Sequence, residues 1–258
     1  MIDLHCHILP AVDDGPPDWK TSLEMVRIAA EDGITVMAAT PHDVGWQGPK
    51  PPRILVPFLV AQLNRRVRQA GLDIKVVAGM EALIDPGLAA RVDAGTVLRL
   101  SSSRYVLVEL PFSLWPQFTE AALFQLQVRG YRPILAHVER YQAVQAQPER
   151  LMDLVSRGIM LQVTGHSLTG LFGKDVRATA EQLLEANLVH LLASDCHTPR
   201  GRRPELAAAR VAAATVVGEA SAQALVADVP DAIIHDQEVN LPPPGALKKR
   251  RRRLFNLF

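Results

Sequence analysis

The sequence has few cysteines, no long hydrophobic run and no N-terminal targeting pattern. Only two cysteines, Cys6 and Cys196, occur in 258 residues, which excludes a disulfide-stabilised secreted scaffold. No apolar run is long enough to cross a bilayer, and no basic stretch precedes an apolar one as in a signal peptide. We therefore expect a cytoplasmic protein that is large enough to bury the core of an α/β domain.

An excess of positive charge is absent from most of the chain. The formal net charge is +1, and because residues 248–253 (KKRRRR) carry six positive charges, the rest of the chain carries −5. Aromatic residues make up only 5% of the sequence. This is not the composition of a nucleic-acid-binding domain, so no nucleic-acid partner is expected.

What the sequence does contain is a regular alternation of strand-like and helix-like segments. The strand-like runs are nearly continuous in apolar residues, which is typical of parallel strands buried on both faces. They cover residues 2–7, 34–40, 74–80, 105–110, 132–137, 159–164 and 189–195. Repeated strand–helix units predict a parallel sheet with helical crossovers. Seven such units favour a closed barrel over an open sheet.

Amphipathic stretches between these runs predict helices. Thr21 and Glu24 form a capping-box pattern, and Gly33 marks the other end of that helix. Further helices are expected at 53–70, 118–129, 148–157 and 175–187, with a long last helix at 204–228. We predict one domain over residues 1–235, followed by an extended basic tail over 236–258.

Histidines and carboxylates gather at the ends of the predicted strands. In an α/β barrel the carboxyl ends of the strands open on one face, where active sites lie, so these side chains should converge there. They come from six of the seven strands and the loops that follow them. The candidate metal ligands are His5, His7, Asp14, His42, Glu81, Glu109, His137, Asp195 and His197.

Any one of these residues could be a helix cap or a turn former. As a set they indicate metal binding, because neighbouring carboxylates repel one another unless cations lie between them. Imidazole and carboxylate ligands without thiolates favour Mn²⁺, Fe²⁺ or Zn²⁺ over Ca²⁺ or Mg²⁺. This number of ligands predicts two or three ions, an arrangement suited to the hydrolysis of phosphate esters.

Arginines near the strand ends support the phosphate interpretation. A guanidinium can bind two phosphate oxygens at once, and Arg140 and Arg202 each follow a candidate ligand closely, with Arg203 beside the second. Surface ion pairs are the alternative role for any of the three. His166 follows the sixth strand and is a candidate substrate contact, whereas His190 lies inside an apolar strand and is expected to be a core residue.

The opening segment MIDLHCHILPAVDDG divides its polar residues between two roles. The spacing of His5 and His7 puts both on one face of the strand, so that one ion can bind both. Cys6, between them, should face the packing. Asp14 is the expected ligand, and Asp13 is expected to shape the turn.

Seven segments, in this order, carry a family resemblance: MIDLHCHILPAVDDGP, ATPH, GME, VELP, AHVERY, LQVTGHSLTGLFG and SDCH. With them the chain resembles the bacterial PHP (polymerase and histidinol phosphatase) family. Within that family it is most similar to the manganese-dependent protein-tyrosine phosphatases of capsule and exopolysaccharide assembly. The resemblance extends over about residues 1–235 and implies a distorted (β/α)7 TIM-like barrel.

The resemblance also implies a trinuclear site and a substrate. It assigns His5, His7, Glu81 and Asp195 to one ion, Glu81, Glu109 and His137 to a second, and Asp14, His42 and His197 to a third. It makes Arg140 and Arg202 the phosphate contacts, and a metal-bound water or His42 would protonate the leaving phenolate. The implied substrate is phosphotyrosine on a membrane tyrosine autokinase that controls polysaccharide chain length.

Three features depart from the family pattern. Cys196 stands where a small or apolar residue is more common, and Thr198 stands where Asn is common. The loop 43–58 is unusually rich in proline and differs from the usual version with His and Asn. These departures leave the metal ligands intact and bear on substrate access.

Alternative functions are open at this stage. Cys196 and Arg202 fit Cys-x₅-Arg, the signature of thiol-based tyrosine phosphatases, although Pro199 removes a backbone donor from such a phosphate cradle. A phosphatase of the same superfamily that acts on histidinol phosphate is a second alternative, and a non-catalytic partner of a kinase is a third. The tail 248–258 is either a solvated chain or a segment that docks on an anionic membrane, which would place the protein at the inner membrane face.

Overall fold

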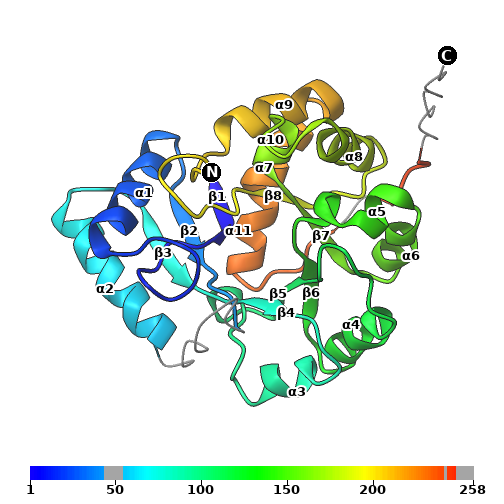
Figure 1. The fold of residues 1–258 in the computed structure, drawn as a ribbon, viewed down its shortest axis with the longest axis horizontal. Coiled ribbons are helices and arrows are strands. Elements are labelled where there is room, and N and C mark those ends of the chain that lie inside the picture. Colours follow the sequence, from blue (N-terminus) through cyan, green and yellow to red (C-terminus); the bar gives the residue numbers. More distant parts are fainter. Residues whose placement is uncertain (44–54, 241–242, 248–258) are drawn as a thin grey trace.

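Short parallel strands surrounded by helices form the molecule (Figure 1). The computed structural model describes residues 1–43, 55–240 and 243–247. One sheet has the order β1 (Ile2–Cys6), β2 (Val36–Ala39), β3 (Lys75–Ala78). The other has the order β4 (Glu81–Leu83), β5 (Tyr105–Glu109), β6 (Arg132–Leu135), β7 (Met160–Thr164), β8 (Leu191–Ala193). Every neighbouring pair is parallel, so the predicted α/β class with parallel sheets is confirmed.

Backbone contacts link the two sheets at both sides. Beyond β8, the N–H of Asp195 donates to the carbonyl of His5 at 2.9 Å, and the N–H of His7 donates to the carbonyl of Cys196 at 2.9 Å. On the other side, His42 and Glu81 form an isolated parallel bridge. The last strand in sequence therefore lies next to the first.

Both faces of the strands are buried, as the apolar runs indicated. Along β5, Val106 and Val108 belong to a large core cluster that includes the helices, whereas Leu107 belongs to a second, smaller cluster. This second cluster also includes Leu4 of β1 and Ile233 from a later helix, and its members come from strands of both sheets. Successive side chains on a strand point to opposite faces, which explains the division.

The helices lie mainly on the outside of the strands in Figure 1. In chain order they are α1 (Trp19–Glu31), α2 (Leu55–Gln69), α3 (Leu88–Asp93), α4 (Thr119–Val128), α5 (Gln142–Ala146), α6 (Arg150–Ser156), α7 (Gly165–Leu168), α8 (Lys174–Glu185), α9 (Ala207–Val217), α10 (Glu219–Val226) and α11 (Asp228–Ile234). Two 3₁₀ turns, η1 (Leu100–Ser102) and η2 (Val138–Arg140), follow α3 and β6. Helix α11 packs against β1 and η1.

Two of the predicted helix boundaries are wrong. Helix α1 begins at Trp19, because the carboxylate of Asp18 accepts the N–H of Thr21 at 2.8 Å and is the N-cap in place of Thr21. The long helix expected at 204–228 is instead a loop followed by α9, α10 and the start of α11. Gly218, between α9 and α10, has a φ of 82°, in the left-handed region that ends helices.

The third predicted strand is interrupted. β3 ends at Ala78, and Glu81 begins β4 instead of ending β3. At the break, the N–H of Glu81 donates to the carbonyl of Pro41 at 3.1 Å, and the N–H of Asp43 donates to the carbonyl of Glu81 at 3.0 Å. The segment around His42 thus replaces β2 as the pairing partner, which moves Glu81 next to His42.

Residues 236–240 and 243–247 are part of the predicted tail and lie against the rest of the protein. The hydroxyl of Tyr105 donates to the carbonyl of Gln237 at 2.7 Å, and the N–H of Gly245 donates to the carbonyl of Ala186 at 2.8 Å. Residues 44–54 of the Pro-rich loop and the basic residues 248–258 lie outside the described residues.

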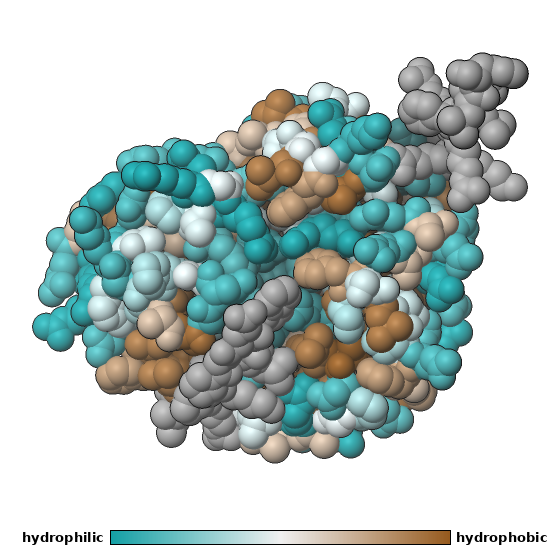
Figure 2. Space-filling view, in the orientation of Figure 1, coloured by the Kyte–Doolittle hydropathy of each residue, from teal (hydrophilic) through white to brown (hydrophobic). Residues whose placement is uncertain are grey.

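Surface hydrophobicity is dispersed. In the part of the chain that the structure describes, no helix has the length and apolar character needed to cross a membrane. The face seen in Figure 2 carries hydrophobic residues in separate patches among hydrophilic ones. The large hydrophobic side chains that are exposed include Phe124 and Val128 on α4.

Candidate metal centre

All nine predicted ligands converge, although Glu81 begins β4 instead of ending a strand. Each belongs to at least one group of side chains whose ligand atoms lie within 4.8 Å of one another. Eight of the nine are buried, and Asp14, at the mouth, is the exception. The sequence placed these residues at strand ends, and the parallel sheets bring those ends together.

Glu81 is the centre of the cluster. Its Oε2 atom lies 3.2 Å from Nε2 of His5, 3.3 Å from Nε2 of His7 and 3.1 Å from Nδ1 of His42. Its Oε1 atom lies 2.8 Å from Nε2 of His137. Four imidazoles from the ends of β1, β2 and β6 and the residues that follow them therefore meet at a single buried carboxylate.

The remaining carboxylates flank this centre. Oδ1 of Asp195 lies 3.4 Å from Nε2 of His5, and Oε1 of Glu109 lies 3.3 Å from Nδ1 of His42. At the mouth, Oδ1 of Asp14 lies 3.2 Å from Nε2 of His197.

The observed groups overlap the implied ligand sets but divide the residues differently, since Asp195 groups with His5 and His137 instead of with His7 and Glu81. The groups are His7, Asp14, His42 and His197; His5, His7 and Glu81; His5, His137 and Asp195; and His42, Glu81 and Glu109. The implied third set is contained in the first group. Glu81 and Glu109 are joined here by His42, whereas the resemblance pairs them with His137, whose Nε2 lies 3.8 Å from Oε2 of Glu109.

Hydrogen bonds at the outer ring nitrogens orient the first two histidines. Nδ1 of His7 lies 2.6 Å from Oδ2 of Asp13, and Nδ1 of His5 lies 3.0 Å from Oε1 of Gln162. Oxygen acceptors at Nδ1 place the proton there, so in each neutral ring Nε2 carries a lone pair. Both lone pairs face Glu81, and the two Nε2 atoms are 3.3 Å apart. Lone pairs that converge on a carboxylate fit a divalent cation between them.

The electrostatics of the cluster depend on the same pairs. Burial lowers the pKa of His7, but Asp13 and Glu81 more than compensate, so that the pKa lies well above its usual value. Burial raises the pKa of Glu81, but His5 and the other histidines outweigh it and hold the pKa well below its usual value. Without a cation, these carboxylates favour a proton on His7, and a bound ion would take the place of that proton.

Arg140 and Arg202 share one partner beside the cluster. Nη1 of Arg140 donates to Oδ2 of Asp195 at 2.7 Å, and Nη2 of Arg202 pairs with the same oxygen. With Asp14, His42 and Phe112 they line a polar cavity of about 90 Å³ over the ligands. Asp195 thus faces the histidines through Oδ1 and the arginines through Oδ2.

His166 and Arg203 do not line this cavity. His166 lies in the short helix α7, and Arg203 pairs with Oε1 of Glu205 at 2.7 Å. His190 is buried, and its Nδ1 accepts the N–H of Leu161 at 2.8 Å, which confirms the prediction of a core histidine.

Two backbone positions in the site are strained. His137 has a φ of 35° and Asp195 a φ of 51°, in the left-handed region that residues with a side chain seldom adopt. Each of these residues lies two positions after the end of a strand. Strain of this kind persists where surrounding contacts enforce it, and it is common at functional sites.

The cysteine-based alternative is wrong. Cys196 is fully buried in the main core cluster and is not among the residues that line the cavity. A thiol must reach the phosphorus atom to attack it. Cys6 is buried in the same cluster, as expected.

Several residues that support the ligands were not predicted from the sequence. Asp13 does shape its turn, accepting the N–H of Gly15 at 3.0 Å, but it also holds His7. Arg91 pairs with Asp43, the residue after His42. Gln162 was visible as the one amide in the apolar run MLQVT, and that signal could have identified it.

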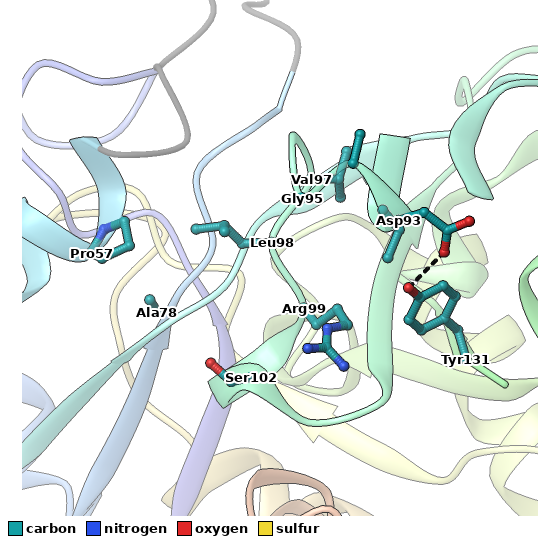
Figure 3. Close-up of a pocket in the computed structure, with 11 residues that line it drawn as sticks. Pro57, Ala78, Asp93, Gly95, Val97, Leu98, Arg99, Ser102 and Tyr131 are labelled. Carbon is teal, nitrogen blue, oxygen red and sulfur yellow. Dashed lines mark hydrogen bonds between the residues drawn. The ribbon is translucent and has the colours of Figure 1, made fainter. Parts of the chain in front are cut away.

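A larger cavity lies elsewhere. It has a volume of about 660 Å³ and lies between α2 and the segment after α3, with Pro57, Asp93, Arg99, Ser102 and Tyr131 among its lining residues (Figure 3). Asp93 there accepts a hydrogen bond from the hydroxyl of Tyr131 at 2.8 Å. No predicted metal ligand lines this cavity.

Parallel sheets with a histidine–carboxylate cluster near the strand ends define an α/β protein with a candidate metal centre. Residues 1–235 match the family described as "Capsular polysaccharide synthesis, CpsB/CapC". The chain belongs to this family.

Similar proteins include curated relatives and a solved structure. The tyrosine-protein phosphatase YwqE of Bacillus subtilis is 35% identical over 258 residues, the full length of both chains. The tyrosine-protein phosphatase CpsB of Streptococcus pneumoniae is 28% identical over 243 residues, 92% of this chain and 99% of that one. A crystal structure from work on YwqE and CpsB, described as "unique metal-dependent tyrosine phosphatases", superimposes with a TM-score of 0.92 at 34% identity, covering 96% of this chain and 100% of the other.

Proposed function

We propose that this protein is a metal-dependent phosphatase that removes phosphate from phosphotyrosine in proteins. The observation that carries the proposal is the cluster around Glu81, in which ring nitrogens of four histidines meet one buried carboxylate beside two arginines. Family membership and the named activities of YwqE and CpsB support the same function.

The cofactor we propose is two or three divalent ions, with Mn²⁺ favoured over Fe²⁺ and Zn²⁺. The donor set of imidazoles and carboxylates without thiolates fits these ions. When bound, the ions would polarise a phosphoryl oxygen and make water more acidic. The proposed ligands are His5, His7, Asp14, His42, Glu81, Glu109, His137, Asp195 and His197.

The phosphate would be held by Arg140 and Arg202. Both residues line the cavity, and both guanidinium groups contact Oδ2 of Asp195. Charge that develops on the phosphate oxygens is stabilised by such fixed donors. A phenol has a pKa of about 10, so the leaving phenolate needs little help from an acid, and His42 at the cavity is the proposed donor when help is given.

The finer architecture is part of the proposal. The contacts between β1 and the segment after β8, and the bridge at Glu81, support a closed, distorted (β/α)7 barrel in which β3 and β4 form one interrupted strand. We propose residues 1–235 as the catalytic unit, in agreement with the extent of the family match.

The substrate protein we propose is a membrane tyrosine autokinase of capsule or exopolysaccharide synthesis. The tail 248–258 would dock on the anionic inner face of the membrane, since each basic residue near such a surface contributes about 1 kcal/mol. Deleting 248–258 should abolish sedimentation with vesicles that contain anionic lipid and leave hydrolysis of a free peptide unchanged. Equal sedimentation of both chains would reject the membrane role.

The experiment that tests the activity compares substrates and metal states. Purified protein should hydrolyse a phosphotyrosine peptide with added Mn²⁺ and lose this activity in a chelator. Activity that survives removal of all metal would reject the mechanism. Faster turnover of histidinol phosphate than of the peptide would favour a small-molecule phosphatase instead.

A further inference from the structure

Arg140 is held by more than its ion pair. It ends the turn η2 after β6, and its side chain is only 16% exposed. The side chain has several rotatable bonds, so one hydrogen bond to Asp195 at 2.7 Å leaves its plane free to rotate about that contact.

Two aromatic rings flank the guanidinium. The central carbon of Arg140 lies 4.5 Å from the ring centroid of Phe112 and 4.5 Å from that of Phe172. Phe112 follows β5, and Phe172 lies in the loop after α7. A guanidinium stacks on aromatic faces while its edge stays available for hydrogen bonds.

Phe112 is itself fixed by the metal site. Its ring centroid lies 5.1 Å from that of His137 and 6.0 Å from that of Tyr141. The hydroxyl of Tyr141 accepts the N–H of Leu110 at 2.9 Å, which ties this ring to the end of β5. Phe112 also lines the cavity over the ligands. Because its ring packs against both His137 and Arg140, the position of His137 influences the orientation of the Arg140 guanidinium.

Arg202 differs in this respect. Among the described residues it has the ion pair with Asp195 but no aromatic ring against its guanidinium. Phe172 does not line the cavity, so loss of its ring should affect the cavity through Arg140 alone.

We propose that Phe112 and Phe172 are positioning residues that fix the plane of Arg140 for phosphate. The inference rests on the proposed function, because it assigns Arg140 to a phosphate group. The two rings restrict the guanidinium so that its N–H edge faces Asp195 and the cavity.

The test uses Phe172→Leu and Phe112→Leu, with Phe172→Tyr as the conservative variant. The dissociation constant for inorganic phosphate, measured by calorimetry on the metal-loaded protein, should rise about threefold to thirtyfold in each Leu variant. The kcat/KM for a phosphotyrosine peptide should fall by a similar factor. Phe172→Tyr keeps a ring and should restore both values to near those of the wild type.

Two controls separate positioning from a general loss of structure. Phe124→Leu removes an exposed ring on α4 and should change neither value. In an Arg140→Ala background, Phe172→Leu should have no further effect. If Phe112→Leu fails to fold, Phe172→Leu carries the test, because its loop lies outside the helices and strands.

The outcomes distinguish this inference from the proposed function. Wild-type protein that binds phosphate but does not hydrolyse the peptide would reject the phosphotyrosine activity, and the phosphate measurements would still test the two rings. Phosphate binding by Phe172→Leu equal to that of the wild type would overturn the inference. So would an equally large effect of Phe172→Leu in the Arg140→Ala background.

Discussion

At the residue scale, the site is built from ligands and from the side chains that orient them. Asp13 illustrates the second kind, because its carboxylate holds Nδ1 of His7 at 2.6 Å and also accepts the N–H of His42 at 3.2 Å. A carboxylate in this role fixes the ring and makes the other nitrogen a better ligand.

Replacing Asp13 should therefore weaken metal binding without removing a ligand. We expect Asp13→Asn to lower metal affinity by about 10- to 100-fold, measured by competition with a metal-sensitive dye. Asp18→Asn, a few residues on, is the matched control, since Asn caps a helix as well as Asp does. Equal affinity in Asp13→Asn and in the control would show that His7 does not need this carboxylate.

A second residue-scale prediction concerns acid stability. Burial lowers the pKa of His190 to about 4. The folded protein therefore keeps His190 neutral at pH values where the unfolded chain, with a pKa near 6.5, takes up a proton. Stability that is present above pH 6.5 should be lost as the pH falls from 6.5 towards 4, by up to about 3 kcal/mol.

His190→Gln should flatten this part of the pH dependence, because Gln can accept the same N–H and does not titrate. The measurement is the free energy of unfolding in urea at several pH values between 7 and 4. His235→Gln, at an exposed histidine after α11, should leave the slope as in the wild type. An unchanged slope in His190→Gln would contradict the assignment.

At the element scale, the sequence predicted the features that repeat along the chain. Seven apolar runs predicted the strands, and Gly33, which has a positive φ, predicted a helix end. The ligands were found because parallel strands end on one side. Their supporting residues were missed because the partners are distant in sequence, as with Gln162 and His5. The break between β3 and β4 depends on pairing with the segment around His42, which periodicity does not reveal.

Helix α7 offers a test of packing between elements. A Cβ atom added at Gly165 would lie 2.8 Å from Cβ of Ala209 on α9, closer than such atoms approach. Gly165→Ala should therefore lower the free energy of unfolding by about 1–3 kcal/mol. Ala209→Gly, which opens that space, should cost about 0.5–1 kcal/mol by itself.

The double variant should be less destabilised than the two single changes together. Chemical denaturation of all four proteins measures this coupling. Ala208→Gly adds the same helix glycine at an exposed neighbouring position and should show no coupling with Gly165→Ala. Simple additivity for the pair Gly165 and Ala209 would mean that α7 moves away from α9 freely.

At the scale of the whole molecule, the candidate metal centre connects the first strand, β1, with the segment that follows the last strand, β8. His5 lies in the first strand and His7 directly follows it, whereas Asp195 and His197 follow the last strand. An ion bound between these segments would hold β1 beside β8, in addition to the backbone bonds that already link them. Metal binding should therefore stabilise the complete fold and not only the cavity.

Removing the metal should lower the melting temperature of the whole protein in one transition. An ion present at one hundred times its dissociation constant stabilises the folded state by about 2.7 kcal/mol. In a chain of this size, 1 kcal/mol shifts the melting temperature by about 2–4 °C, so we expect a fall of about 5–10 °C in a chelator. Calorimetry with and without chelator measures the shift, and added Mn²⁺ should reverse it. Glu81→Gln removes the central carboxylate and should show a much smaller difference between the two conditions. Elemental analysis establishes that the metal has been removed. If the melting temperature is then unchanged, the contacts between β1 and β8 hold these ends together without an ion.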